Sequence, residues 1–196
     1  MVAVSAQLTH DVTAVDWSSD GTFLAVGDRN GSCTVLDAES LQVMGSFDAY
    51  NVNKKDAWVE VVKISPDSSM IAFGTHGGCS RVELAKVTAQ KKVQKIASAN
   101  LGLSSALNHM DWSMDGQFLV LNSQANELMW MSVDSKKQVS ASSAKDIDWY
   151  TWTCIFGFPV QGIWPGLDYT NIKTVDRSHS GTILATGDDF GTVKLF

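Results

Sequence analysis

Two similar stretches decide the fold, Thr22-Phe-Leu-Ala-Val-Gly-Asp-Arg-Asn-Gly31 and Thr182-Ile-Leu-Ala-Thr-Gly-Asp-Asp-Phe-Gly191. Each begins with a short run of apolar and β-branched residues and continues into a turn rich in Asp and Gly. A second short run follows each turn, Ser32-Cys-Thr-Val-Leu-Asp37 in the first case and Thr192-Val-Lys-Leu-Phe196 in the second. Short runs of this kind, separated by residues that close tight turns, indicate antiparallel strands.

A segment centred on a serine precedes these runs and repeats along the chain. Four segments align, at Val12–Gly21, Val59–Ser68, Ala106–Gly116 and Ile172–Gly181. Their shared serines are Ser18, Ser65, Ser113 and Ser178, at separations of 47, 48 and 65 residues. WD-type repeats have a period of roughly 45 residues, so the third unit carries an extra stretch of about 17 residues.

The repeat predicts an all-β fold of about four consecutive WD40-type β-propeller blades. Strands are expected at 12–18, 22–27, 32–37, 41–47, 58–65, 69–74, 79–87, 91–97, 106–113, 117–122, 127–132, 137–142, 171–178, 182–187 and 191–196. No window has a sustained helical period with capping residues, which disfavours a parallel α/β sheet. A single meander cannot bury both of its faces, whereas blades arranged around an axis cover one another.

The whole chain, 1–196, is therefore interpreted as part of a WD40 β-propeller. Its units are expected at about 9–47, 58–97, 105–142 and 170–196, with an aromatic insertion at 143–169. Either Ala3–Leu8 completes the last blade and closes a four-bladed ring, or the chain is a piece of a larger ring whose remaining blades the parent chain supplies. We favour the piece, because an unfinished last blade would leave a sheet edge open to unwanted pairing.

Specific motifs point to a family. The unit His10-Asp-Val-Thr-Ala-Val-Asp-Trp-Ser-Ser-Asp-Gly21 resembles a WD40 repeat, although the Trp-Asp dipeptide is missing. The insertion contains Thr151-Trp-Thr-Cys-Ile-Phe-Gly-Phe-Pro-Val-Gln-Gly-Ile-Trp-Pro165, which a generic WD blade has no reason to contain. Together with Thr170–Gly181 and Ala185–Gly191, this stretch is similar to the second of two tandem propellers in the echinoderm microtubule-associated protein-like (EMAP-like) family.

The resemblance implies a non-catalytic protein-binding scaffold associated with microtubules or the axoneme. It implies tubulin or axonemal proteins as partners, and a place in the cytoplasm and cytoskeleton, including the axoneme of a cilium or flagellum. It also implies a further blade after Phe196. The sequence lacks the family's first propeller and its N-terminal coiled-coil or basic segment. Two other hypotheses stay open: a generic WD40 adaptor in another intracellular complex, and a propeller enzyme with a site in its central channel.

Composition and cysteine spacing disfavour several other classes of function. The net charge of −6 and the scattered Lys and Arg residues disfavour binding to nucleic acid or to an anionic membrane. Cys33, Cys79 and Cys154 lie far apart, so we expect neither a disulfide framework nor a zinc site, and no cofactor is predicted. Without a cationic leader or a stretch of roughly 18 apolar residues, the protein is expected to be soluble and intracellular.

The polar residues of the repeats suggest structural roles, and none is assigned a catalytic one. Asp16, Asp111 and Asp176 recur two residues before the shared serines. A residue that repeats in several blades is expected to serve the fold, because an active site is built only once.

Turn and blade contacts are expected of four further residues. His10 is expected to form a hydrogen bond within its blade, since buried polar groups need partners. Asp28, Asp188 and Asp189 are expected to accept hydrogen bonds from backbone N–H groups of their turns.

Aromatic residues gather in the insertion and outside the repeat pattern. Trp17, Trp58 and Trp112, by contrast, fall in first strands and are expected in the core. One interpretation is that the insertion folds back as an extra hairpin and buries its aromatic residues between blades. The other is partner binding, because aromatic residues are enriched in binding hot spots. The candidate partner-binding residues are Trp152, Phe158, Trp164 and Tyr169.

Overall fold

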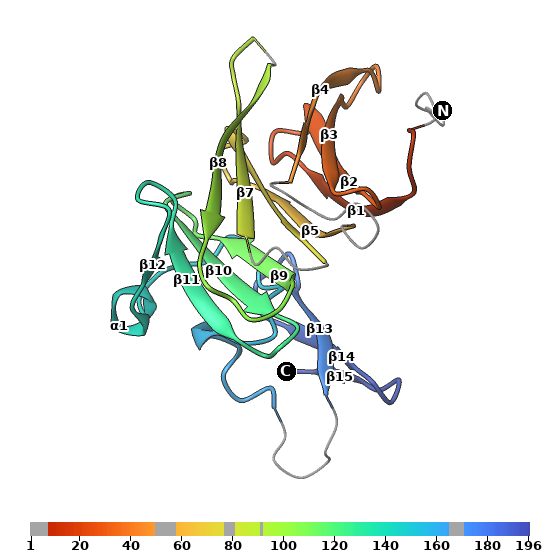
Figure 1. Ribbon diagram of the computed structural model, residues 1–196. Coiled ribbons are helices and arrows are strands. Elements are labelled where there is room, and N and C mark those ends of the chain that lie inside the picture. Colours follow the sequence, from red (N-terminus) through yellow and green to blue (C-terminus); the bar gives the residue numbers. More distant parts are fainter. Residues whose placement is uncertain (1–7, 50–57, 77–80, 91, 165–170) are drawn as a thin grey trace.

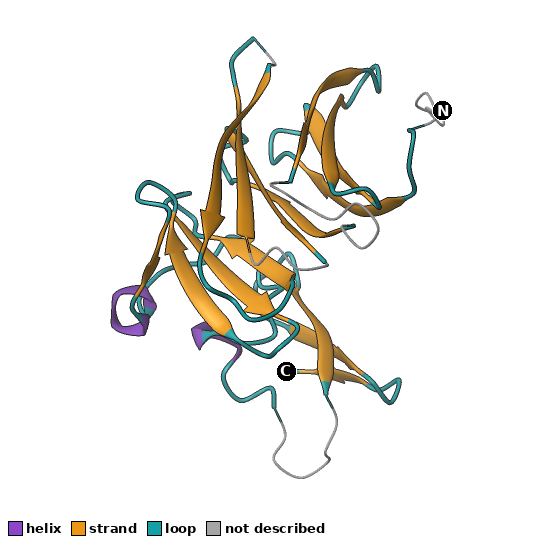
Figure 2. Cartoon of the chain, viewed as in Figure 1, coloured by secondary structure: helices purple, strands orange, loops and turns teal. Residues whose placement is uncertain are grey.

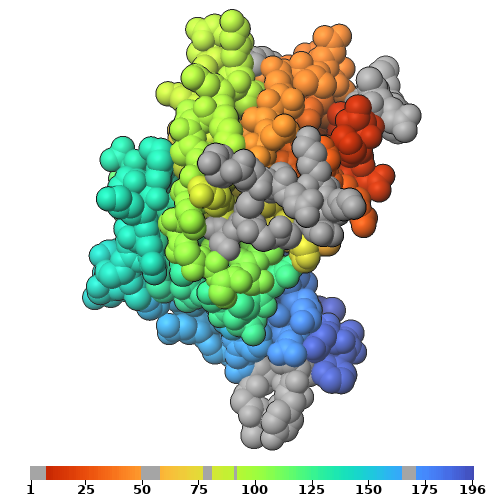
Figure 3. Space-filling model, viewed as in Figure 1, coloured from red at the N-terminus to blue at the C-terminus, as the bar shows by residue number. Residues whose placement is uncertain are grey.

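Four antiparallel sheets follow one another along the chain in the computed structural model, which describes residues 8–49, 58–76, 81–90, 92–164 and 171–196. Within these ranges, the strands of each sheet are neighbours in sequence order. The sheets succeed one another from the red and orange N-terminal unit through green and teal to the blue C-terminal unit (Figures 1 and 3). Propeller blades have this arrangement of consecutive meanders, so the predicted fold class is confirmed.

The strand bounds agree with the predicted strands to within three residues at each end. The first sheet contains β1 (Val12–Trp17), β2 (Phe23–Asp28), β3 (Ser32–Asp37) and β4 (Val43–Asp48). The second contains β5 (Val59–Ile64), β6 (Met70–Thr75), β7 (Arg81–Val87) and β8 (Val93–Asn100). The third contains β9 (Leu107–Trp112), β10 (Phe118–Ser123), β11 (Leu128–Ser132) and β12 (Lys137–Val139). The fourth contains β13 (Ile172–Arg177), β14 (Leu184–Asp188) and β15 (Val193–Leu195).

The shared serines close the first turn of every sheet. In each case the serine Oγ accepts a hydrogen bond from the backbone N–H five residues later, at Phe23 (3.0 Å), Met70 (2.9 Å), Phe118 (2.9 Å) and Ile183 (3.2 Å). A hydroxyl on a short side chain reaches a backbone group of its own turn more readily than a long side chain does. The serine repeat therefore fixes the geometry of the turn between the first two strands.

Close approach between neighbouring sheets depends on glycine near the end of the second strand. A Cβ placed on Gly27 would lie 2.5 Å from Val59 Cβ, and one on Gly74 would lie 2.6 Å from Leu107 Cβ. Since carbon atoms in contact sit about 3.5–4.0 Å apart, only glycine fits at these two positions. The first strands of the second and third sheets, β5 and β9, thus lie directly on the preceding sheet.

The tryptophans of the first strands do not share one environment. Trp112 is 1% exposed, and its indole N–H donates to Lys63 O (3.1 Å). This hydrogen bond crosses the contact between the second and third sheets, which we call the second junction. Trp58 is half-buried and stacks on His76 just before β5. The expectation that Trp17 lies in the core is wrong, because it is 57% exposed. Trp17 and Val15 share a side of β1 that no described element covers.

Residues 141–164 contain two short helices, and this described part of the chain forms no extra hairpin of the kind considered above. Helix α1 (Ala141–Ala144) is capped by Ser140, and the 3-10 helix η1 (Phe158–Val160) begins after Gly157 (Figure 2). Ser140 also explains why β12 ends earlier than predicted. Between residues 143 and 164 the structure shows one isolated bridge, Trp149 with Ser113, and no strand pair.

Some predictions fall outside the described residues. They concern Tyr169 and most of Ala3–Leu8. In the part of the chain that is described, no helix is long and apolar enough to span a membrane.

Candidate functional site

The insertion lies as a wedge between the third and fourth sheets. Towards the third sheet it contributes to one buried cluster, formed by Val120, Trp130, Ala144, Trp149 and Cys154. Towards the fourth sheet it contributes to another, formed by Ile155, Val160, Ile163, Ile172, Val175 and Leu184. Because consecutive residues Cys154 and Ile155 belong to opposite clusters, the insertion is a layer of its own between two blades.

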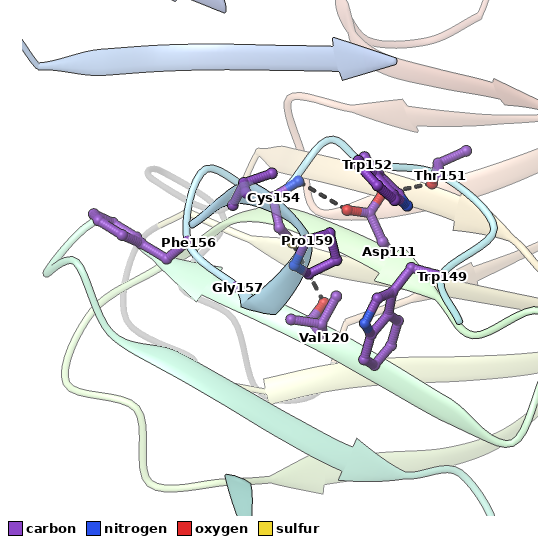
Figure 4. Close-up of a pocket in the computed structure, with 10 residues that line it drawn as sticks. Asp111, Val120, Trp149, Thr151, Trp152, Cys154, Phe156, Gly157 and Pro159 are labelled. Carbon is purple, nitrogen blue, oxygen red and sulfur yellow. Dashed lines mark hydrogen bonds between the residues drawn. The ribbon is translucent and has the colours of Figure 1, made fainter. Parts of the chain in front are cut away.

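Asp111 on β9 holds the start of this wedge (Figure 4). Its carboxylate is 1% exposed and accepts bonds from the backbone N–H groups of Thr153 and Cys154, both at 2.8 Å. The hydroxyls of Thr151 (2.5 Å) and Thr153 (2.8 Å) also donate to it. These four donors satisfy the buried carboxylate, as a charge removed from water requires. In the first sheet, Asp16 plays a similar part by accepting the Ile64 N–H of the next sheet (2.7 Å).

Asn122 on β10 holds the middle of the wedge. Its side chain accepts the Phe156 N–H (2.9 Å) and donates to Phe156 O (3.1 Å). Asn122 occupies the position that Gly27 and Gly74 hold in the first two sheets, next to last in the second strand. Where Gly27 and Gly74 let the next sheet approach closely, the buried Asn122 amide instead forms two hydrogen bonds with the backbone of the insertion.

Stacked rings define the outer part of the wedge. Phe156 and Trp164 lie parallel, with centroids 4.9 Å apart, and Trp164 Nε1 donates to Ile155 O (2.9 Å). Phe158 stacks on Trp130 at 5.5 Å. The guanidinium of Arg177, at the end of β13, lies 4.3 Å from the centroid of the Trp152 ring. Cation and aromatic groups attract at such distances, so this contact joins the wedge to the fourth sheet.

The interior of the wedge leaves little room for chemistry. The cavity lined by Asp111, Trp149, Trp152 and Cys154 has a volume of about 10 Å³, at the lower limit for one water molecule. Burial raises the pKa of the Cys154 thiol far above its ordinary value, which disfavours the reactive thiolate. Among the described residues, no group of three or more His, Cys, Asp and Glu side chains is arranged to hold a metal ion.

One histidine bridges the third and fourth sheets directly. His109 Nε2 lies 3.0 Å from Lys173 O, and because a carbonyl only accepts, this nitrogen carries the proton and donates. Burial lowers the pKa of His109 from its ordinary value of 6.5. The ring is therefore held as a neutral donor, and its Nδ1 lone pair has no hydrogen-bond partner among the described residues.

The turn residues singled out in the sequence make local contacts. Asp28 accepts the N–H groups of Asn30 (2.8 Å) and Ser32 (2.9 Å), and His10 Nδ1 lies 3.5 Å from its other oxygen. In the fourth sheet, Asp188 accepts from Phe190 (3.0 Å) and Thr192 (2.8 Å). Asp189 differs from the expectation, because its carboxylate accepts the N–H of Asn171, just before β13, and not an N–H of its own turn (3.0 Å).

The candidate partner-binding residues differ in placement. Trp152, Phe158 and Trp164 are half-buried in the wedge, so each combines a core contact with an accessible surface. Tyr169 lies outside the described residues. Sequence reasoning missed Asn122 and Arg177. For Asn122 a signal was present, since the alignment of repeats places Asn where two other units have Gly.

Comparison with known proteins agrees with the motifs in the insertion. The model of one protein family, described as "Echinoderm microtubule-associated protein second beta-propeller", matches residues 1–196. The chain belongs to this family. The resemblance inferred from the insertion is thereby confirmed, and the four sheets are blades of the family's second β-propeller.

Relatives in this family carry names that refer to microtubules. The chain is 37% identical over 179 residues to mouse "Echinoderm microtubule-associated protein-like 1", covering 90% of this chain and 21% of that protein. It is 36% identical to the "77 kDa echinoderm microtubule-associated protein" of Lytechinus variegatus, covering 90% and 26% respectively. Human "Echinoderm microtubule-associated protein-like 3" is 32% identical over 198 residues, covering 100% and 21%. The chain thus spans about a quarter of these relatives or less.

Proposed function

We propose that this chain works as a non-catalytic protein-binding scaffold that associates with microtubules or the axoneme. Membership of the echinoderm microtubule-associated protein family supports the microtubule connection. The wedge carries the proposal of protein binding, because Trp152 and Phe158 are anchored by buried neighbours and still partly accessible. Rigidly held aromatic residues lose little conformational entropy on binding, and this favours contact with a partner. The proposed location is the cytoplasmic cytoskeleton, including the axoneme of cilia and flagella.

The chemistry of the described residues supports a scaffold over an enzyme. Asp111, the carboxylate at the centre of the wedge, already accepts four hydrogen bonds from the insertion. Burial raises the pKa values of the Cys33 and Cys154 thiols, so both are poor nucleophiles. Groups committed to the fold in this way are not free to act on a substrate.

We also propose that a longer parent chain supplies further blades of the same propeller. Val15 and Trp17 on β1 are 58% and 57% exposed, and Val193 and Leu195 on β15 are 72% and 69% exposed. Apolar residues at these positions fit faces that neighbouring blades cover in a ring.

Co-sedimentation tests the scaffold function. The native protein that contains this sequence is mixed with taxol-stabilised microtubules or isolated axonemes and pelleted, with the unpolymerised mixture as control. We expect the protein in the pellet only when polymers are present. A protein that stays in the supernatant with both polymers would contradict the proposal, and its capture with a different intracellular complex would favour the generic adaptor.

A further inference from the structure

A groove runs along the exposed side of the wedge. Its first part has a volume of about 390 Å³ and is lined by residues that include Met114, Lys145, Asp148, Trp152, Phe158 and Arg177. A second hollow of about 310 Å³ shares Trp152, Pro159 and Arg177 with the first and extends towards Ile183. Because they share these three residues, the two hollows adjoin each other, and together we call them the insertion groove.

The insertion groove exists because the wedge separates two turns that meet elsewhere in the molecule. At the first junction, Ser19 Oγ lies 2.9 Å from Ser68 Oγ and also donates to Pro66 O, so the turns of the first two sheets touch. The matching turns of the third and fourth sheets carry Met114 and Ile183, and the wedge stands between them. Both side chains are left exposed, at 54% and 47%.

Two aromatic side chains on the floor of the insertion groove are held in place by packing against the wedge. Trp152 and Phe158 form its aromatic part, and Phe158 is fixed by its stack on Trp130. Met114 adds a flexible, polarisable side chain at the edge. Trp, Met and Arg are the residue types that are enriched in protein interfaces, so this floor fits a polypeptide better than a small polar molecule.

Arg177 provides a positioned cation at the point where the two hollows join. Its guanidinium is held over the Trp152 ring, and in the described part of the chain no carboxylate forms an ion pair with it. A guanidinium that is stacked on a ring keeps its N–H edge available to bind both oxygens of a carboxylate.

The other charged groups of the insertion groove are less constrained. Lys145 adds a second positive charge, and its Nζ lies 3.8 Å from the exposed Asp146 Oδ2. Asp148 is exposed, and its backbone carbonyl accepts the Met114 N–H (2.8 Å). Exposed pairs of this kind contribute little, so the fixed charge that selects a ligand is the Arg177 guanidinium.

We propose that the insertion groove binds an acidic peptide segment of a partner protein. One carboxylate of the segment pairs with Arg177, and a neighbouring apolar side chain packs on Met114, Trp152 and Phe158. The two adjoining hollows give room for several residues of a peptide, and the stacked cation supplies the charge complementarity. This proposal rests on the scaffold function above and names the chemistry of its partner.

Peptide binding tests the proposal directly. The probe is a short dye-labelled peptide in which glutamates flank a leucine, and the readout is fluorescence anisotropy with the full chain. We expect the acidic peptide to bind. A matched peptide with glutamine in place of glutamate should bind with an affinity lower by about ten-fold or more, because the charge-assisted hydrogen bonds are lost. No binding of the acidic peptide, or equal binding of both peptides, overturns the proposal.

Substitutions locate the binding site. Arg177→Gln should weaken binding of the acidic peptide about ten-fold or more. The matched control is Arg29→Gln, since Arg29 also lies over a tryptophan, 5.7 Å from the Trp58 ring, but far from the insertion groove at the first junction. Met114→Glu changes a side chain that is 54% exposed, so it should fold normally and still weaken binding by charge repulsion. Unchanged affinity in both groove variants overturns the proposal.

The outcomes separate this proposal from the scaffold function. If the native protein pellets with microtubules but the acidic peptide does not bind, the groove proposal fails and the scaffold function stands. If the peptide binds through Arg177 but the native protein pellets with neither microtubules nor axonemes, the groove proposal stands and the cytoskeletal function fails.

Discussion

The first and third junctions between sheets solve the same problem in different ways. At the first junction, β5 lies directly on the first sheet, with Thr13 donating to Val59 O (2.7 Å) and Asp16 accepting the Ile64 N–H. At the third junction, the equivalent carboxylate of Asp111 bonds to the insertion instead of β13.

This difference shows that a layer can be inserted between two blades when two residues of the repeat bond to the inserted segment and not to the next sheet. The position that Gly27 holds in the first sheet is held by Asn122 in the third sheet, and the side-chain amide of Asn122 forms hydrogen bonds with the Phe156 backbone. The aspartate is kept, but its bonding partners move from the next sheet to the wedge. A direct contact between the third and fourth sheets survives at His109, which donates to Lys173 O.

The largest expected effect comes from removing the carboxylate that holds the wedge. Asp111→Ala should lower the free energy of unfolding by about 3 kcal/mol or more, because the Thr153 and Cys154 N–H groups lose their acceptor and each unpaired buried group costs about 1–3 kcal/mol. Urea denaturation of the chain measures the change. Asp176→Ala is the matched control, since Asp176 is exposed and the one hydrogen bond that its carboxylate accepts from the described residues comes from its neighbour Arg177. Equal losses in both variants would show that the wedge contact adds nothing.

A smaller loss is expected at the second junction, where sheets are in direct contact. Gly74→Ala places a Cβ 2.6 Å from Leu107 Cβ and should cost about 1–3 kcal/mol through overpacking. Gly187→Ala is the control at the same position of the fourth sheet, where the nearest atom, Thr174 Cγ2, is 3.0 Å away. Thermal unfolding of both variants gives the comparison. A Gly74 variant as stable as the Gly187 variant would contradict the close approach between sheets.

The smallest effect concerns pH and the bridge at His109. Burial lowers the pKa of His109 below 6.5, so as the pH falls through this value the unfolded chain takes up a proton before the folded chain does. The contribution of His109 to the free energy of unfolding is present above pH 6.5 and decreases as the pH falls below it. The slope of this decrease is at most about 1.4 kcal/mol per pH unit. His109→Gln keeps a donor for Lys173 O but cannot titrate. Its stability should vary less between pH 7 and 5, and parallel curves for variant and parent would refute the assignment.

Much of the fold was predictable because its signals are local and repeated. The serine and the β-branched runs act within one hairpin, so their pattern in the sequence corresponds directly to strands such as β2 and β14. The family was recognisable from the insertion, where Phe158 and Trp164 occur outside any repeat.

The placement of the wedge was less accessible from sequence. Asn122 and Phe156 are 34 residues apart, and no periodic pattern links them. Trp17 and Trp112 occupy equivalent positions in first strands, yet one is exposed and the other buried, because burial depends on which element covers each face. Arg177 gained its significance only from the Trp152 ring beneath it. Such contacts between distant segments are decided by tertiary packing, which local propensity does not report.

The position of Asp111 also has a consequence for synthesis on the ribosome. Strand β12 ends at Val139, so all four strands of the third sheet are translated before Thr153 and Cys154. Domains fold from the N-terminus as they emerge, at about 5–20 residues per second. Until residues 153 and 154 emerge, the Asp111 carboxylate lacks these donors and stays hydrated. The third blade can therefore complete its packing only after its own insertion has been translated.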